Sequence, residues 1–150
     1  LLGPQSGAMG YGLPAAIAAR IARPEARVIC IAGDGDVQMT MQELGCAMQA
    51  GAAPILLVVN NASYGTIRMH QERTYPGRVS FTDIANPDFV GIGHAYGMHA
   101  ERITRTEDFP DAFERATISA TGALIELVID TESLTPRQTL SAMRTAALEG

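Results

Sequence analysis

Two short loops carry side chains that could bind a metal ion together with a phosphate group. Gly33-Asp34-Gly35-Asp36 follows one apolar run of the sequence, and Asn60-Asn61 begins the loop after the next apolar run. The Asp34 carboxylate, the Asn61 amide oxygen and a free backbone carbonyl are oxygen ligands of the type that Mg²⁺ takes when it also carries phosphate oxygens and water. The glycines beside Asp34 let the backbone approach a bulky anion closely. These residue types and their spacing predict a metal-bridged diphosphate site.

The elements that must position these loops alternate between strands and helices. Residues 28–32 and 55–59 are unbroken apolar runs, typical of strands that are covered on both faces in a parallel sheet. Apolar residues recur at helical spacing between positions 37 and 48, which predicts one helix that ends at Gly51 and directs its N-terminus at the Asp34 loop. Because the carboxyl ends of parallel strands meet at one edge, both loops should lie together where open α/β sheets bind ligands.

The rest of the sequence continues this alternation. Asn86-Pro87 predicts a helix N-cap followed by a first-turn proline, and another helix is expected after Thr106. Residues 123–129 predict a clear strand, and residues 98–103 predict a weaker one. The order of elements favours a doubly wound α/β domain over residues 1–130, with a mostly parallel sheet and helices on both faces. Residues 131–150 are expected to form a polar C-terminal tail with a short helix.

Composition excludes several classes of protein. Of the 150 residues, 47% are hydrophobic and 18% are charged, which is typical of a globular domain and not of a disordered chain. The net charge is −5 and there is no run of basic residues, so no nucleic-acid partner is expected. No stretch approaches the roughly 18 apolar residues of a membrane span. Cys30 and Cys46 are expected to be reduced thiols in a cytoplasmic protein, and the chain, which lacks an initial Met, is expected to be part of a longer one.

Two other functions stay open on the sequence. Residues 10–15 fit G-x-G-x-x-A, the fingerprint of nicotinamide dinucleotide-binding domains, although that fingerprint should follow a strand and here it precedes the first one and contains a proline. A non-catalytic cofactor-binding or regulatory domain is the second alternative. His70, His94 and His99 show no metal-ligand spacing.

Taken together, these motifs resemble those of the thiamine diphosphate-dependent enzymes. Gly33-Asp34-Gly35 is followed after twenty-four residues by Asn60-Asn61, which is similar to the cofactor-binding motif of that family. Residues 7–16, GAMGYGLPAA, resemble the segment that precedes this motif in acetolactate synthases and related 2-oxo acid decarboxylases. Residues 60–68, NNASYGTIR, resemble the corresponding loop of benzoylformate decarboxylase-type enzymes. The resemblance spans nearly the whole chain and covers the C-terminal, diphosphate-binding domain of such enzymes.

The resemblance implies roles for individual residues. Asp34, Asn61 and the main-chain carbonyl of Ser63 would bind Mg²⁺, and the backbone N–H groups of residues 35–37 would bind the diphosphate. The carbonyl of Gly7 would accept a hydrogen bond from the 4′-amino group of thiamine diphosphate. The residues expected to contact the cofactor are Gly7, Ala8, Met9, Gly33, Asp34, Gly35, Asp36, Val37, Asn61, Ser63, Tyr64, Gly65, Thr66 and Ile67.

Met9 would lie beneath the bend between the two cofactor rings and hold the 4′-nitrogen beside the thiazolium C2 proton. Thr66 and Ile67 fall where the family lines its substrate pocket. Acetolactate synthases typically carry a Gln-Trp pair after the two asparagines, whereas residues 67–70 are Ile-Arg-Met-His, so the substrate stays open.

The implied activity belongs to a larger assembly. The resemblance predicts decarboxylation of a 2-oxo acid, after which the resulting enamine is protonated or joined to a second carbonyl compound. The glutamate that pairs with the pyrimidine ring lies in a separate N-terminal domain of the family and is not expected in these 150 residues. We therefore expect the chain alone to be inactive, and the complete enzyme to be a homodimer or homotetramer.

Overall fold

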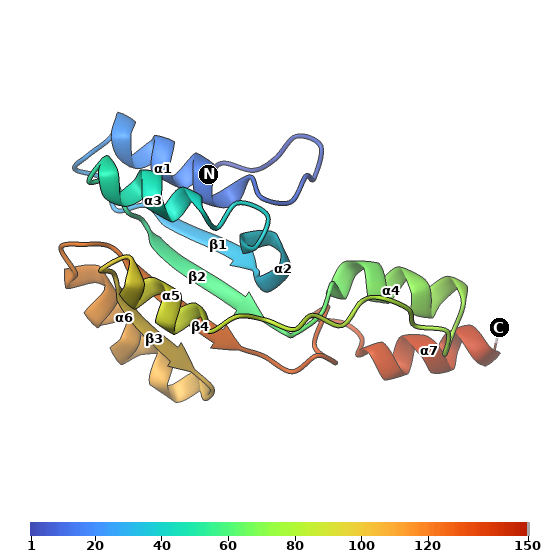
Figure 1. Cartoon of the computed structure of the whole chain (residues 1–150). Coiled ribbons are helices and arrows are strands. Elements are labelled where there is room, and N and C mark those ends of the chain that lie inside the picture. Colours follow the sequence, from blue (N-terminus) through green and yellow to red (C-terminus); the bar gives the residue numbers. More distant parts are fainter. Residues whose placement is uncertain (150) are drawn as a thin grey trace.

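The centre of the molecule is a parallel sheet, seen in the computed structural model that describes residues 1–149 (Figure 1). Within those residues the sheet has four strands, which from edge to edge are β1 (Ile29–Gly33), β2 (Ile55–Asn60), β4 (Ala123–Val128) and β3 (His99–Ile103). Ile29 pairs with Ile55, Ile55 pairs with Ala123, and Ala123 pairs with His99. All carboxyl ends therefore meet at one edge, as expected from the apolar runs.

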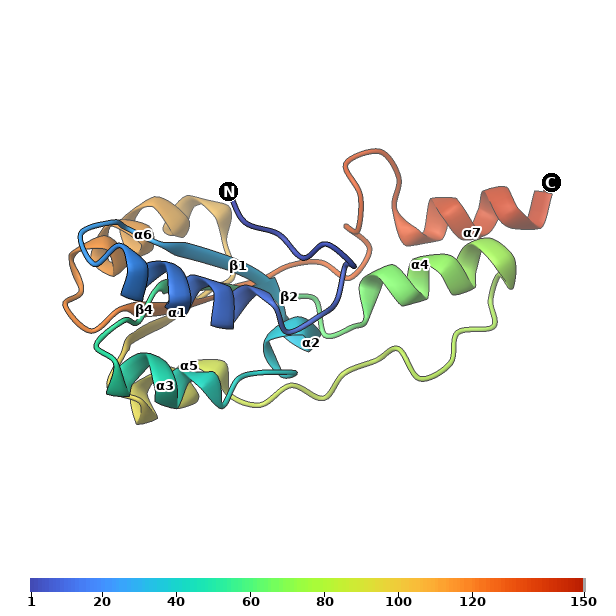
Figure 2. The same ribbon diagram turned by 90° about the horizontal axis from the view of Figure 1, so that it is seen from above.

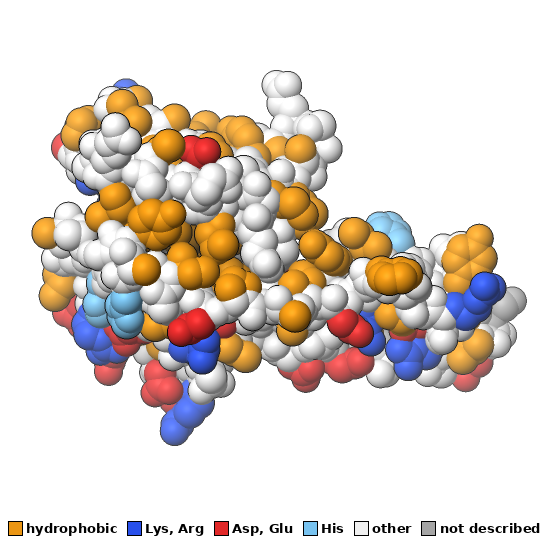
Figure 3. Space-filling model, viewed as in Figure 1, with side chains coloured by type: hydrophobic (Ala, Val, Ile, Leu, Met, Phe, Trp, Pro, Cys, Tyr) orange, Lys and Arg blue, Asp and Glu red, His pale blue; other side chains and the backbone are white. Residues whose placement is uncertain are grey.

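One face of the sheet is covered by helices from three parts of the chain, namely α1 (Gly12–Ala22), α3 (Glu43–Gln49) and α5 (Phe89–Ala95). Leu44 and Phe89 are completely buried on this face, and they belong to the same apolar cluster as Leu56 of β2 and Leu124 of β4. Figure 3 shows hydrophobic side chains across the middle of the molecule and charged side chains along its lower border.

The opposite face is covered less completely. The single 3₁₀ turn η1 (Thr106–Asp108) leads into α6 (Phe109–Ile118), which buries Ala112 and Ala116 against β2, β3 and β4. Ile29 and Ile31 of the edge strand β1 stay 44% and 69% exposed on this side, so the strand is confirmed but the prediction that residues 28–32 are covered on both faces is wrong. Helices thus lie on both faces, and the doubly wound α/β fold predicted from the sequence is confirmed.

A pair of helices projects from the carboxyl edge of the sheet (Figures 1 and 2). α4 (Gly65–Thr74) follows the loop after β2, and α7 (Leu140–Glu149) lies beside it. The side chain of Glu72 in α4 is fully buried, and both of its carboxylate oxygens accept hydrogen bonds from the guanidinium of Arg144 in α7. The backbone N–H of Gly77 donates a further bond at 2.9 Å. These donors, Arg144 first, lower the pKa of Glu72 to about 2.

The prediction of one helix between residues 37 and 48 is wrong. The chain forms the short helix α2 (Asp34–Val37), a series of turns, and then α3. The N–H of Thr40 bonds the carbonyl of Val37, only three residues earlier, and the Thr40 hydroxyl donates to the carbonyl of Gly10 at 2.9 Å. This contact with a distant segment accompanies the break, which no local periodicity reveals.

Two further differences concern helix positions. Asn86 does not cap α5, because Asp88 occupies the N-cap position and the Asn86 side chain makes tertiary hydrogen bonds instead. The helices α1 and α4 were not expected from periodicity.

The expected end of α3 is confirmed: Gly51 has a φ of +60°, and the N–H of Ala52 bonds the carbonyl of Ala47. No helix within residues 1–149 is long and apolar enough to cross a bilayer.

Candidate functional site

A cavity of about 420 Å³ opens at the carboxyl edge of the sheet, beside the start of the projecting helix pair. It is lined by segments 7–9, 33–36 and 61–67, which are far apart in the sequence, and by residues of the connection that leads to α7. The predicted site residues that line it are Gly7, Ala8, Met9, Gly33, Asp34, Gly35, Asp36, Asn61, Ser63, Tyr64, Gly65, Thr66 and Ile67. Val37 is the exception, because its side chain is buried in the apolar core while its backbone belongs to the first turn of α2.

Asp34 is a buried carboxylate at the junction of β1 and α2. Asp34 is only 2% exposed to solvent, and it takes part in none of the ion pairs among residues 1–149. One carboxylate oxygen accepts the N–H of Gly35 at 3.0 Å, and the other accepts a hydrogen bond from Asn86 at 2.7 Å. Buried charges in proteins are paired or coordinate metals. A carboxylate in this environment fits a bound cation.

The loop after β2 is held in a defined shape. The side-chain oxygen of Asn61 accepts the N–H of Ser63 at 3.1 Å, which is an Asx turn. The Ser63 hydroxyl donates to the carbonyl of Thr82 at 3.0 Å, and the Thr131 hydroxyl donates to the carbonyl of Asn61 at 2.9 Å. Hydrogen bonds to two distant segments therefore hold the loop that carries the predicted metal ligands, the Asn61 amide oxygen and the Ser63 carbonyl.

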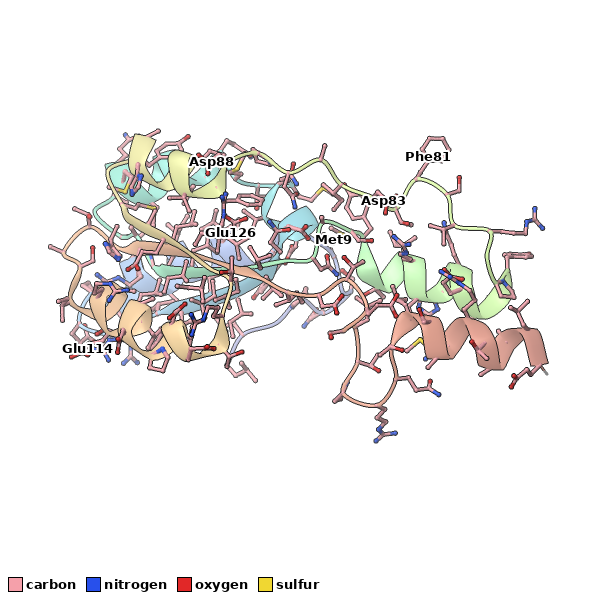
Figure 4. All side chains as sticks on the ribbon, turned by 90° about the horizontal axis from the view of Figure 1, so that it is seen from below. Met9, Phe81, Asp83, Asp88, Glu114 and Glu126 are labelled. Atoms are coloured by element: carbon pink, nitrogen blue, oxygen red, sulfur yellow. The ribbon has the colours of Figure 1, made fainter. Side chains whose placement is uncertain are left out.

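The segment containing Met9 is tied to the Asp34 loop by Asp36. The carboxylate of Asp36 accepts the N–H of Gly10 at 2.5 Å, and the φ of Gly10 is +84°. Met9 itself is 44% exposed, and Figure 4 shows it at the junction between the sheet and the helix pair. The sequence suggested only a backbone role for Asp36, since its side-chain partner lies 26 positions away.

Two glycines allow the loops to approach one another. A Cβ atom at Gly35 would lie 2.6 Å from Cε1 of Tyr64, and one at Gly65 would lie 2.5 Å from Cδ2 of Leu134. Neither distance is compatible with a side chain unless the neighbour moves. The glycines therefore set how closely the Asp34 loop, the Asn61 loop and the C-terminal segment pack around the cavity.

Some residues that line the cavity were missed by the sequence reasoning, and they are Pro4, Val59, Ile129, Ser133 and Leu134. Ile129 follows the end of β4, so its place at the carboxyl edge could have been inferred from the strand. Leu134 lies in a segment without any periodic pattern, and no local signal marks it. His70 is exposed on α4 and is not among the residues that line the cavity.

Comparison with known proteins identifies the family of this chain. The family described as "Thiamine pyrophosphate enzyme, C-terminal TPP binding domain" matches residues 3–127. The chain belongs to the thiamine pyrophosphate enzymes. Its relatives include the acetolactate synthase large subunit of Cyanidium caldarium, 38% identical over 127 residues, which cover 83% of this chain and 22% of the relative. The mitochondrial acetolactate synthase catalytic subunit of Saccharomyces cerevisiae is 41% identical over 125 residues, which cover 83% of this chain and 18% of the relative.

A solved structure shares both the fold and part of the sequence. The thiamine diphosphate-dependent 4-hydroxybenzoylformate decarboxylase of Rhodococcus jostii RHA1 superimposes with a TM-score of 0.78 at 32% identity. The match covers 85% of this chain and 24% of that chain. Our chain therefore spans about a fifth of the length of the curated relatives it matches. The resemblance to thiamine diphosphate enzymes, inferred from the motifs, is confirmed.

Proposed function

We propose that this chain is the diphosphate-binding part of a longer enzyme that uses thiamine diphosphate and Mg²⁺ to decarboxylate a 2-oxo acid. One observation carries the proposal. The Asp34 carboxylate is buried without a cationic partner within residues 1–149, and it lines the same cavity as Asn61 and Ser63. A carboxylate, an amide oxygen and a backbone carbonyl form the oxygen donor set that suits Mg²⁺ when phosphate oxygens and water complete the coordination.

Each donor retains the capacity to bind a cation. The Asn61 amide oxygen accepts one hydrogen bond, and the Ser63 carbonyl accepts one from the N–H of Gly65 at 2.8 Å. Because each such oxygen has two lone pairs, one remains for the metal. The backbone N–H groups of Asp36 and Val37 lie in the first turn of α2, where no carbonyl four residues earlier in the helix is available to them. These groups would bind diphosphate oxygens, whereas the N–H of Gly35, for which the same role was predicted, donates to the Asp34 carboxylate.

The remaining cavity residues would orient the reactive part of the cofactor. Thiamine diphosphate, when bound, supplies the acceptor for the electron pair that is released as CO₂ leaves. The Gly7 carbonyl would accept a hydrogen bond from the 4′-amino group, and Met9 would enforce the bent arrangement of the two rings. Thr66 and Ile67 would contact the substrate at the start of α4.

The substrate and the remaining domain are part of the same proposal. The decarboxylase of Rhodococcus jostii RHA1 is named after 4-hydroxybenzoylformate, which is a 2-oxo acid. This name supports a 2-oxo acid as the substrate of the enzyme that contains the present chain. We expect the carbon atom that loses CO₂ either to be protonated or to form a bond to a second carbonyl compound, as the names of the relatives span both outcomes. A carboxylate for the pyrimidine ring would come from an N-terminal domain of a homodimer or homotetramer.

The experiment compares thiamine diphosphate affinity with and without Mg²⁺ in the full-length protein and its Asp34→Asn variant. We expect the variant to bind the cofactor more weakly and to lose its dependence on Mg²⁺, because the amide removes the charge that holds the metal. Asp83→Asn is the matched control, since Asp83 is exposed and pairs with Arg68 outside the donor set. If Asp34→Asn retains wild-type affinity and the same Mg²⁺ dependence, the proposal is wrong.

A further inference from the structure

Asn86 connects the ends of the first two strands through its side chain. It lies in the long connection between α4 and α5, yet its amide nitrogen donates to a carboxylate oxygen of Asp34 at 2.7 Å and to the side-chain oxygen of Asn60 at 2.8 Å. Its amide oxygen accepts a hydrogen bond from the side chain of Gln38 at 2.8 Å. Both amide hydrogens and the amide oxygen of Asn86 are therefore used, and Asp34, Asn60 and Gln38 are its partners.

The chain of hydrogen bonds continues across the sheet. The amide nitrogen of Asn60 donates to one oxygen of Glu126 at 2.6 Å, and the other oxygen of Glu126 accepts from Arg102 at 2.7 Å. The Glu126 side chain is 3% exposed and lies in β4, as Figure 4 shows, while Arg102 reaches Asp88 at the start of α5 at 3.2 Å. The network thus extends from the candidate metal ligand, by way of β2, β4 and β3, to the exposed Asp88 at the start of α5.

The orientation of each amide in this network is determined by its neighbours. Carboxylates only accept hydrogen bonds when they are ionised, so Asp34 and Glu126 require donors. If Asn86 were turned over, its oxygen would face the Asp34 carboxylate and the Asn60 oxygen, which already accepts the N–H of Ala62 at 3.0 Å. The network therefore has one consistent arrangement, in which Asn86 donates to Asp34.

This arrangement constrains the carboxylate before any ligand arrives. One oxygen of Asp34 is held by the N–H of Gly35 and the other is held by Asn86, so rotation about the Cβ–Cγ bond breaks at least one hydrogen bond. Each oxygen keeps a second lone pair. Partners that orient a metal ligand in this way typically change metal affinity by 10–100-fold when they are removed.

We infer that Asn86 is a positioning residue for the cation, acting through Asp34 and supported by Gln38 and Asn60. This inference rests on the proposed function, in which Asp34 binds Mg²⁺. Asn86 itself does not line the cavity and is not proposed to touch the metal or the cofactor. Its effect would appear in metal affinity because an unrestrained carboxylate loses orientational freedom when the metal binds.

The test is the Asn86→Ala variant of the full-length enzyme, with Mg²⁺ titrated calorimetrically at saturating thiamine diphosphate. We expect the Kd for Mg²⁺ to rise by about 10–100-fold. Gln71→Ala is the matched control, because it removes two hydrogen bonds with the backbone of Ser80 in the same connection but makes no contact with Asp34. Its Kd for Mg²⁺ should equal that of wild type.

A second readout separates positioning from simple loss of stability. In a Gln38→Ala background, Asn86→Ala should weaken Mg²⁺ binding less than it does in wild type, because both side chains act through the same hydrogen-bonded amide, whereas a general structural defect would weaken both equally. If Asn86→Ala fails to fold, the half-buried Gln38→Ala variant loosens the same amide and should still raise the Kd several-fold.

The outcomes distinguish the two proposals. If wild type binds Mg²⁺ with the cofactor and Asn86→Ala or a folded Gln38→Ala binds it equally well, the inference about Asn86 is overturned and the proposed function stands. If wild type binds no Mg²⁺ at saturating thiamine diphosphate, both are overturned. A loss of Mg²⁺ affinity in Asn86→Ala that the Gln71→Ala control does not share supports the inference.

Discussion

Arg144→Met tests how α7 is held against α4 next to the cavity. The substitution keeps an unbranched side chain with an aliphatic stem but removes both guanidinium donors from the buried Glu72 carboxylate. Lowering the pKa of Glu72 from 4.5 to about 2 corresponds to roughly 3 kcal/mol of stabilisation at neutral pH. Part of this shift comes from the N–H of Gly77, which the variant keeps, and solvent screens the 37% exposed Arg144, so we expect the free energy of unfolding to fall by about 2 kcal/mol.

The assay is urea unfolding of wild type and Arg144→Met at pH 7 and at pH 3. Since the folded-state pKa of Glu72 is lowered, its contribution is present above pH 4.5 and is lost as the pH falls towards 2. The difference between the two proteins should therefore shrink at pH 3. Arg105→Met is the control, because Arg105 and Glu107 form a largely exposed pair whose loss should leave the midpoint unchanged. An unchanged midpoint for Arg144→Met at pH 7, or a difference that persists undiminished at pH 3, would refute the reasoning.

Three other predictions address the cofactor contacts, the glycine packing and the chain by itself. Met9→Ala in the full-length enzyme should leave cofactor affinity nearly intact but slow exchange of the thiazolium C2 proton, measured by NMR. An unchanged exchange rate would mean that Met9 packs against the protein and does not position the cofactor rings. Gly35→Ala should lower the free energy of unfolding in urea by about 1–3 kcal/mol, because the added Cβ would collide with the ring of Tyr64. Gly33→Ala should be tolerated, since the atom nearest to its added Cβ, the Cβ of Asp36, is 4.0 Å away. The isolated chain should fold, self-associate in sedimentation experiments and show no 2-oxo acid turnover. Ile31→Lys should reduce this association, because Ile31 is an exposed apolar side chain on an edge strand. Sustained turnover by this chain would contradict the need for another domain.

Local sequence patterns were sufficient to locate the strands and the two loops. The apolar runs at residues 28–32 and 55–59 agree with β1 and β2 to within one residue. The run of β2 could be recognised because a strand buried on both faces needs apolar residues at every position. β1 carries the same kind of run although Ile29 and Ile31 are exposed on one face, so the sequence located this strand without revealing its open face. The loops after these two strands could then be placed at one edge, and the structure shows Asp34 and Asn61 lining a common cavity.

Helix boundaries were harder to predict from the sequence because distant hydrogen-bond partners help to determine them, as the break after α2 illustrates. The spacing of apolar residues from 37 to 48 satisfies a continuous helix, whereas in the folded chain α2 ends at Val37 and the Thr40 hydroxyl bonds the carbonyl of Gly10, 30 positions away. Asn86 likewise has the residue type and the following proline of an N-cap, but its amide is used by Asp34, 52 positions away. A local signal cannot reveal a partner that distant.

By itself the sequence determined which residues carry the oxygen donors and on which strand ends they lie, because residue type and strand burial are encoded locally. Only the tertiary structure decided how those donors are held. Asp36 secures the Met9 segment through Gly10, Asn86 orients Asp34, and Leu134 closes against Gly65. Each of these contacts joins segments separated by 26 or more positions, and the folded sheet is what brings them within hydrogen-bond or van der Waals distance.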